Sequence, residues 1–275
     1  MLGKSLAIGG MMALAVSLAS AADTPRAGVN LTAAQIVDKN VAARGGLQAW
    51  RALQTLEMSG KMDAGGNERR ALPVPGVRTG PNMVPRRPAE PVQLPFVMDL
   101  KRGRKMRVEI QFKGQTAVQV YDGSKGWKLR PFLNRHEVET FTAEELQSAS
   151  AQSDLDGPLV DFAAKGSKVE LEGAEQADGR NAYKLKVTDK GGHVRHVWVD
   201  AETFLEIKVE GTPRRLDGKY HPVATYYRDY KPVSGLMMPY VLETTVDGVK
   251  EKEKIQIEKI VLNPKLDEAR FAMPR

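Results

Sequence analysis

The 275-residue sequence contains no cysteine and only four histidines. The absence of cysteine excludes disulfide bonds, thiolate nucleophiles, iron–sulfur clusters, thiolate zinc sites and a lipid attached to an N-terminal cysteine. Of the histidines, His193 and His196 are three positions apart, a spacing that places them on opposite faces of a strand. They are therefore a poor pair of metal ligands, and we expect no metal site.

The motifs of common enzyme classes are also missing, because the sequence has no HExxH, GxSxG, SxxK, Walker or GxGxxG pattern. Asp154 and Asp156 precede Gly157 and weakly resemble a calcium loop, but the other ligand positions and the closing glutamate are absent. A turn before a helix explains them better. We expect no catalytic residue, no cofactor and no enzymatic activity. A hydrolase whose residues converge from distant parts of the chain is the lesser alternative.

Apolar residues make up 41% of the chain and charged residues 27%. The apolar share is too large for a disordered chain, and outside the N-terminus it is too evenly spread for a protein with several membrane spans. A chain of this length can bury about three quarters of its unfolded surface, so it can fold without a metal or a disulfide.

Residues 1–21 have the pattern of a secretory signal peptide. Lys4 supplies the positive charge, residues 6–18 form an uncharged and mostly apolar run, and Ala19-Ser20-Ala21 is a small-x-small cleavage site. An uncleaved membrane anchor is the alternative, although the run is short for a membrane span. We expect cleavage, export, and a single mature domain over residues 22–275.

The net charge of +7 is compatible with more than one kind of partner. Export argues against nucleic acid as a target. A basic surface outside the cytoplasm would make transient contact with anionic lipid head groups or with an acidic partner. A soluble and mildly basic protein with neither contact is an equal alternative.

Two regions carry helix signals. Residues 32–35 are a capping box followed by an apolar stripe up to Gly45-Gly46, and residues 47–53 continue as a second short helix. Residues 142–145 are another capping box, in which the acidic pair also favours a helix N-terminus. Gly157-Pro158 would break this helix and restart it, and Gly166 would end it. We expect these helices to cover one face of a sheet.

From residue 54 onward the apolar residues mostly alternate with polar ones. The alternating apolar sets are Phe96, Met98 and Leu100; Met106, Val108, Ile110 and Phe112; Tyr183, Leu185 and Val187; Leu205, Ile207 and Val209; and Met238, Tyr240, Leu242 and Val246. Turn dipeptides such as Lys113-Gly114, Asp178-Gly179 and Ser234-Gly235 separate them. This pattern predicts about a dozen antiparallel strands in one large curved sheet, so the fold class is mainly β with flanking helices.

Residues 64–95 interrupt the alternation with seven of the sixteen prolines and five arginines. Proline removes ladder donors, so we expect a long loop inserted between two strands. A disordered insertion and a basic arm that touches a membrane or a partner are the two interpretations of this loop.

Three stretches carry motifs of a known family: residues 100–107 (LKRGRKMR), residues 122–132 (DGSKGWKLRPF) and residues 267–274 (DEARFAMP). They resemble, in this order, three regions of the periplasmic lipoprotein carrier LolA and its relatives: a strand with a Lys-Arg-Pro step, a segment with the same spacing of Asp-Gly, Trp and Pro-Phe, and a C-terminal Phe-x-x-x-Pro region. The resemblance implies an unclosed antiparallel β-barrel with a helical lid over an apolar cavity that holds acyl chains.

The sequence departs from the family where Arg102 is followed by Gly103 instead of proline, and it is longer. It therefore resembles a divergent paralogue rather than the housekeeping carrier. The resemblance implies a monomeric periplasmic protein that carries the acyl chains of lipoproteins or other lipids between membranes, with membrane-bound donor and acceptor proteins. A module on the same fold that senses lipoproteins, or is structural, without transferring them is the alternative.

Arg102 continues the strand face of Leu94, Phe96, Met98 and Leu100. A charge at the end of an apolar face needs partners for its donors, and carbonyls at the end of a covering helix would satisfy a guanidinium. The resemblance implies that Arg102 latches the lid closed. The alternative is that Arg102 emerges into solvent at the strand end.

The candidate residues form two further groups. We expect the cavity lining to be Leu94, Phe96, Met98, Leu100, Met106, Val108, Ile110, Trp127 and Phe132, with plain packing as an equal alternative for the last two. We expect the lid to carry Leu146, Leu155, Leu159 and Phe162. Methionines suit an adaptable lining, although ordinary core packing is the default explanation for each.

Overall fold

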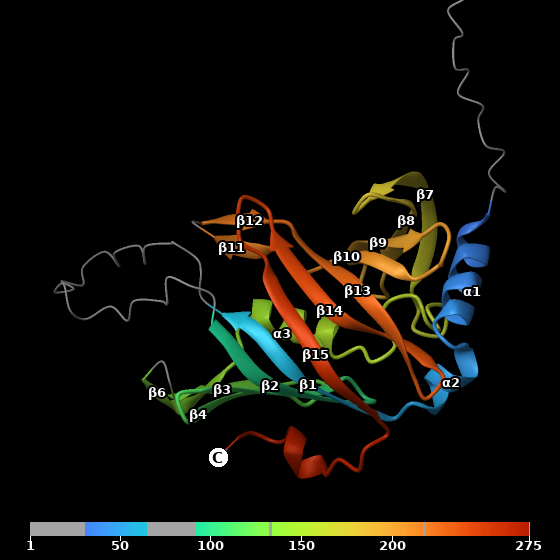
Figure 1. The fold of residues 1–275 in the computed structure, drawn as a ribbon. Helices are drawn as coiled ribbons and strands as arrows, with labels where there is room; N and C mark the ends of the chain where they lie inside the picture. Colours follow the sequence, from blue (N-terminus) through green and yellow to red (C-terminus); the bar gives the residue numbers. More distant parts are fainter. Residues whose placement is uncertain (1–30, 65–91, 132–133, 217, 275) are drawn as a thin grey trace, which may run out of the picture. The chain divides into compact units, whose positions relative to one another are not determined.

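One antiparallel sheet of thirteen strands dominates the fold (Figure 1). The computed structural model describes residues 31–64, 92–131, 134–216 and 218–274, so the predicted signal peptide, residues 65–91 of the predicted loop, and Phe132 lie outside the described residues. The strands run in the order β6-β5-β4-β3-β2-β1-β15-β14-β13-β10-β9-β8-β7, and within the described residues β6 and β7 are not paired with each other. The predicted fold class, an unclosed antiparallel sheet with a helical lid, is confirmed.

The strand bounds are β1 (Thr55–Ala64), β2 (Val92–Lys101), β3 (Lys105–Phe112), β4 (Gln115–Tyr121), β5 (Gly126–Arg130), β6 (Arg135–Thr140), β7 (Lys168–Ala177), β8 (Arg180–Thr188), β9 (Val194–Asp200), β10 (Glu206–Glu210), β13 (Val223–Val233), β14 (Leu236–Val246) and β15 (Glu253–Leu262). A separate two-stranded sheet pairs β11 (Arg214–Leu216) with β12 (Lys219–His221).

Tight turns explain why consecutive strands pair. At Lys113-Gly114, Asp178-Gly179 and Ser234-Gly235 both φ angles are positive, which is the geometry of type I′ turns. The two halves of the sheet meet at β1, which pairs with β2 on one side and with β15 on the other, whereas the chain passes from β6 to β7 through α3. The C-terminal strand therefore joins the two halves.

Three α-helices, α1 (Ala33–Ala43), α2 (Leu47–Ala52) and α3 (Ala143–Gln152), lie on one face of the sheet, which we call the inner face. Both predicted capping boxes are present, at Thr32 and at Thr142. In Figure 1, α3 lies within the curve of the sheet and α1 lies beside β7–β9. Among the described residues, no helix combines the length and the apolar character needed to cross a membrane.

The predicted restart of the helix at Gly157-Pro158 is wrong, because residues 153–166 form consecutive turns instead. Positive φ angles at Gly157 (76°) and Asp161 (53°) interrupt any regular helix. Lys165 stabilises the turns, since its Nζ donates to the Gly157 carbonyl oxygen at 2.7 Å and to the Asp154 carboxylate at 2.9 Å. We call residues 153–166 the turn segment.

Two other predictions need correction. Ala64 belongs to β1 and residues 92–95 belong to β2, and not to a loop. At residues 92–95, β2 pairs with β1 and not with β3, an edge position at which Pro95 is tolerated. Ile207 and Val209 do not share a face with each other. A register shift between Glu206 and Lys208 changes the alternation of β10, and Ile207 and Val209 pack in different clusters.

Candidate functional site

The inner face of the central strands carries a continuous apolar surface. In three rows across β1, β2 and β3, the register aligns Leu56 with Leu100 and Met106, Met58 with Met98 and Val108, and Gly60 with Phe96 and Ile110. Leu94, which is also buried, pairs with Met62 in the next row. The predicted lining residues of β2 and β3 therefore come together as expected from their alternation.

The rows continue onto β15 and β14 and pack beneath the helices. We call this group the inner cluster; its buried members are Trp50, Leu53, Leu56, Phe96, Leu100, Met106, Tyr121, Ala149, Leu155, Val160, Leu236, Met238, Ile257 and Ile260. Several residues packed against it stay partly exposed, among them Met58, Met62, Met98, Val108, Ile110, Leu146, Leu242 and Ile255. The inner face is thus apolar beyond the part that the helices bury.

Arg102 lies at the end of this surface, next to the covering elements. Its guanidinium donates to both carboxylate oxygens of Asp156 at 2.8 and 2.9 Å, and also to the carbonyl oxygen of Trp50 in α2. The Asp156 side chain is 6% exposed and that of Arg102 is 32% exposed. The predicted contact with a helix-end carbonyl is present. Arg102 therefore bridges the sheet, α2 and the turn segment, although its role as a latch stays a prediction.

A second arginine contacts the same turn segment from the other side. Arg44, which caps the end of α1, donates to the backbone carbonyl of Asp156 at 3.0 Å and to the Glu206 carboxylate at 2.9 Å, and its guanidinium stacks over the Trp50 ring at 4.1 Å. Tyr230 donates to Glu206. Burial, together with the Glu206 charge, raises the pKa of Tyr230 well above its usual value, so the hydroxyl stays a donor.

The sequence does not predict that Asp156, Arg44 and Glu206 form a group. Asp156 was predicted only as a turn residue, and Arg44 shows no pattern beyond its place before two glycines. The position of Glu206 among alternating apolar residues predicts a solvent-facing side chain, but the register shift beside it brings the carboxylate to a buried position. No signal in the sequence links the three residues.

Trp127 does not join the lining residues. It packs on the opposite face of the sheet with Val118, Val120 and Phe271, a group that we call the outer cluster. Trp127 is paired with Val120 in the register, so both side chains lie on the same face. The expected lining role of Trp127 is therefore wrong, and packing is the correct interpretation. Phe132 lies outside the described residues.

The three stretches that resemble LolA meet around the outer cluster. The C-terminal turn η2 (Glu268–Phe271) places Phe271 against β4 and Arg270 against the buried Asp99 carboxylate of β2. Glu268 contacts Lys101 at 2.6 Å and Lys105 at 2.5 Å. The C-terminus is thereby held to the β2–β3 hairpin by charge and to β4–β5 by apolar contact.

The predicted lid residues pack in two different clusters. Leu146 and Leu155 pack with the inner cluster, whereas Leu159 and Phe162 pack with α1. We call this second group the α1 cluster; its buried members are Ile36, Val37, Leu159, Leu185, Val187, Val197 and Val199. The turn segment therefore reaches across both clusters.

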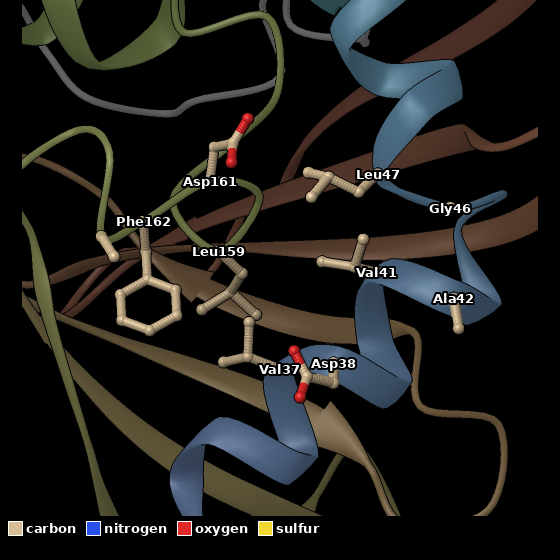
Figure 2. Close-up of a pocket in the computed structure, with 10 residues that line it drawn as sticks. Val37, Asp38, Val41, Ala42, Gly46, Leu47, Leu159, Asp161 and Phe162 are labelled. Atoms are coloured by element: carbon tan, nitrogen blue, oxygen red, sulfur yellow. The ribbon is translucent and has the colours of Figure 1, made fainter.

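An open groove of about 350 Å³ lies where the turn segment meets α1 and α2 (Figure 2). Its apolar lining is Val37, Val41, Ala42, Leu47, Leu159, Phe162 and Ala163, with Gly46 and the carboxylates of Asp38 and Asp161 completing it. In Figure 2, Val41 and Leu47 from the helices face Leu159 and Asp161 from the turn segment. Arg51 of α2 donates to both carboxylate oxygens of Asp161 at 2.7 Å, and this hydrogen bonding, with the arginine charge, lowers the pKa of Asp161.

The described residues contain no group of three or more histidine, aspartate and glutamate side chains arranged to hold a metal ion. His196 lies between two carboxylates, with Nδ1 2.6 Å from Glu210 and Nε2 3.3 Å from Glu172. His193 contacts Asp189 at 3.2 Å. These two histidines thus have partners in ordinary ion pairs or hydrogen bonds.

Solved structures of other proteins share this fold, among them the following three. A LolA superfamily protein from Nitrosomonas europaea aligns with a TM-score of 0.54 and 15% identity, covering 88% of this chain and 98% of its own. A domain of an outer membrane lipoprotein-sorting protein from Vibrio parahaemolyticus aligns with a TM-score of 0.52 and 13% identity over 86% and 94%. A DUF1329 family protein from Desulfovibrio piger aligns with a TM-score of 0.53 and 14% identity over 87% and 97%.

No model of a known protein family and no curated protein sequence matches this chain. The structural comparisons confirm that the chain has a LolA-like fold, and their low identities mark a divergent sequence.

Proposed function

We propose that the protein binds the acyl chains of lipoproteins or other lipids on its inner face and carries them between membranes. The observation that supports this most strongly is the apolar surface of β1–β3, β14 and β15, several residues of which stay partly exposed. The fold is shared with a protein described as lipoprotein-sorting, which favours the same cargo.

The free energy gained by burying an acyl chain is sufficient for a carrier of this kind. Burial of one methylene contributes about 0.8 kcal/mol, so a sixteen-carbon chain gains on the order of 12 kcal/mol without any directional contact. Affinity is therefore easy to obtain, and the difficulty lies in release. Methionine side chains at Met58, Met62 and Met98 adapt to different chain positions.

The proposal includes a site of action and a control of release. The predicted signal peptide leads to the periplasm, where a monomer would receive its ligand from a membrane-bound donor and pass it to an acceptor. Arg102 would keep the lid closed through its bonds to Trp50 and Asp156. Breaking these bonds would let α2 and the turn segment move and free the ligand.

Native mass spectrometry of the protein purified from the periplasm tests the proposal. We expect extra mass from an acyl-containing molecule that organic extraction removes. A protein that is empty and also ignores fatty-acyl probes would support a sensing or structural role on the same fold. Esterase turnover that one point mutation abolishes would support an enzyme instead.

Two substitutions locate the binding face. Met98→Ala removes an inner-face contact and should weaken binding of a fluorescent palmitate analogue by about tenfold. Trp127→Ala removes a side chain of similar apolar character from the outer cluster, so it should lower stability and leave the affinity of the folded protein unchanged. Equal loss of affinity in both variants would contradict binding on the inner face.

A further inference from the structure

The groove between α1–α2 and the turn segment is separate from the inner face, yet it shares side chains with it. Val41 and Leu47 line the groove, and both also pack against the inner cluster. Val41 in addition packs against the α1 cluster. A single layer of side chains therefore forms both a wall of the groove and part of the cover of the inner cluster.

The two walls of the groove are joined by side-chain contacts. At the groove itself Arg51 and Asp161 form the connection, and the Arg51 side chain is 50% exposed. An exposed ion pair of this kind contributes little to stability because water and salt screen it. Deeper in the molecule, Arg44 and Arg102 hold the turn segment through Asp156. The outer contact can thus open while the inner two keep the segment attached.

The side chains that line the groove determine which kind of ligand it can bind. Most of the lining is aliphatic or aromatic, with Leu159 and Val37 fully buried at its base. The volume of about 350 Å³ is at the lower end for a small-molecule site, and the groove opens to solvent. Asp38, at its edge, is exposed and has no ion-pair partner among the residues that the structure describes. A hydrocarbon tail fits this lining, whereas an anionic head group would be repelled.

We propose that this groove is the route by which a hydrocarbon chain passes between solvent and the inner face. The inference rests on the proposed function, since it needs a ligand on the inner face. The chain enters tail first between Leu47 and Phe162. Displacement of α2 from the turn segment, with loss of the Arg51–Asp161 pair, then moves Leu47 aside.

Two adjacent alanines provide a matched test. Ala163 lines the groove and Ala164 does not, and both are exposed, so tryptophan at either position has room to fold. Binding of a fluorescent palmitate analogue is followed by stopped-flow fluorescence, and its equilibrium affinity is measured separately. Ala163→Trp should slow association and dissociation by about tenfold each and leave the affinity unchanged. Ala164→Trp should behave as the unmodified protein.

Three further variants keep the test decisive if Ala163→Trp misfolds. On the opposite wall, Ala42→Trp should slow entry, whereas Ala34→Trp, on an exposed part of α1 away from the groove, should not. Arg51→Gln removes the outer contact and should accelerate entry and exit. Circular dichroism confirms that each variant is folded.

The outcomes separate this inference from the proposed function. If the unmodified protein binds the probe and the groove variants have normal rates, the route is refuted and the carrier function stands. If the unmodified protein does not bind the probe, the carrier function and the route both fail. Slower exchange in the groove variants alone, with unchanged affinity, supports both.

Discussion

The ion pair between Arg102 and Asp156 should couple the sheet to the lid, and Arg102→Leu tests this. The substitution leaves the Asp156 carboxylate, which is 6% exposed, without its main partner. Breaking a fully buried pair costs about 3–5 kcal/mol. Here Lys165 remains 3.7 Å from Asp156 and Arg102 is about one-third exposed, so we expect a loss of about 2 kcal/mol.

A double-mutant cycle isolates the pair. Arg102→Leu and Asp156→Ala are each measured by urea unfolding, alone and together. Because each single change removes the same contact, the double variant should lose about 2 kcal/mol less than the sum of the singles. Arg214→Leu, which breaks an exposed pair with Glu253, is the control and should change stability by less than about 1 kcal/mol.

The loss should be concentrated in the lid. Native-state hydrogen exchange should accelerate by about thirtyfold in α2 and the turn segment, while β8 and β9 keep their protection. Additive energies in the cycle, together with unchanged exchange in α2, would refute the bridging role of Arg102. If the lid retains the ligand, the same variant should also release a bound palmitate analogue faster.

Two further predictions concern the C-terminus and the elbow between α1 and α2. Hydrogen bonds from Lys101 and Lys105 lower the pKa of Glu268 from 4.5 to about 2. Because the pKa of Glu268 is lower in the folded protein than in the unfolded one, the contacts of its carboxylate stabilise the fold. This stabilisation is complete above pH 4.5 and is lost as the pH falls towards 2. An NMR titration should place the midpoint of Glu268 ionisation near pH 2, and Glu268→Gln should reduce the pH dependence of stability between pH 4.5 and 2. A midpoint near 4.5 would contradict the contact with Lys101 and Lys105. At the elbow, Gly45 (φ 109°) and Gly46 (φ 91°) both have a φ that would strain an alanine, but only at Gly45 would a Cβ also collide with a carbonyl oxygen of the β13–β14 turn. Gly46→Ala should lower the free energy of unfolding by about 1–2 kcal/mol, and Gly45→Ala should lower it clearly more. Equal urea midpoints for the two variants would disprove the close approach of Gly45 to the β13–β14 turn.

Local patterns in the sequence determined much of this fold. The alternation in residues 94–112 identifies the inner-face residues of β2 and β3, because side chains two apart must share a face. The capping boxes at residues 32–35 and 142–145 begin α1 and α3, since their hydrogen bonds close within a few residues. The paired positive φ angles of the hairpin turns likewise follow from their own dipeptides.

Only the folded structure shows which side chains of β4 and β5 lie on the inner face and which lie on the outer face. β4 carries apolar side chains on both faces, with Tyr121 in the inner cluster and Val120 in the outer cluster. Alternation therefore groups residues without saying which group faces the lid. Trp127 follows Val120 to the outer face because the two are paired, and Phe271 covers them there.

The order of residues along the chain is enough to group apolar neighbours on a strand, to locate the turns, and to place Arg102 at the end of an apolar row. The contact of Arg102 with Asp156, the contact of Arg44 with Glu206 across 162 positions, and the groove beside the turn segment arise only from packing. The two sets of features differ in the range of the interactions that produce them. Backbone periodicity and capping act within one turn or one hairpin, whereas ion pairs and clefts depend on how distant elements pack, and one residue of register shift can redirect a carboxylate.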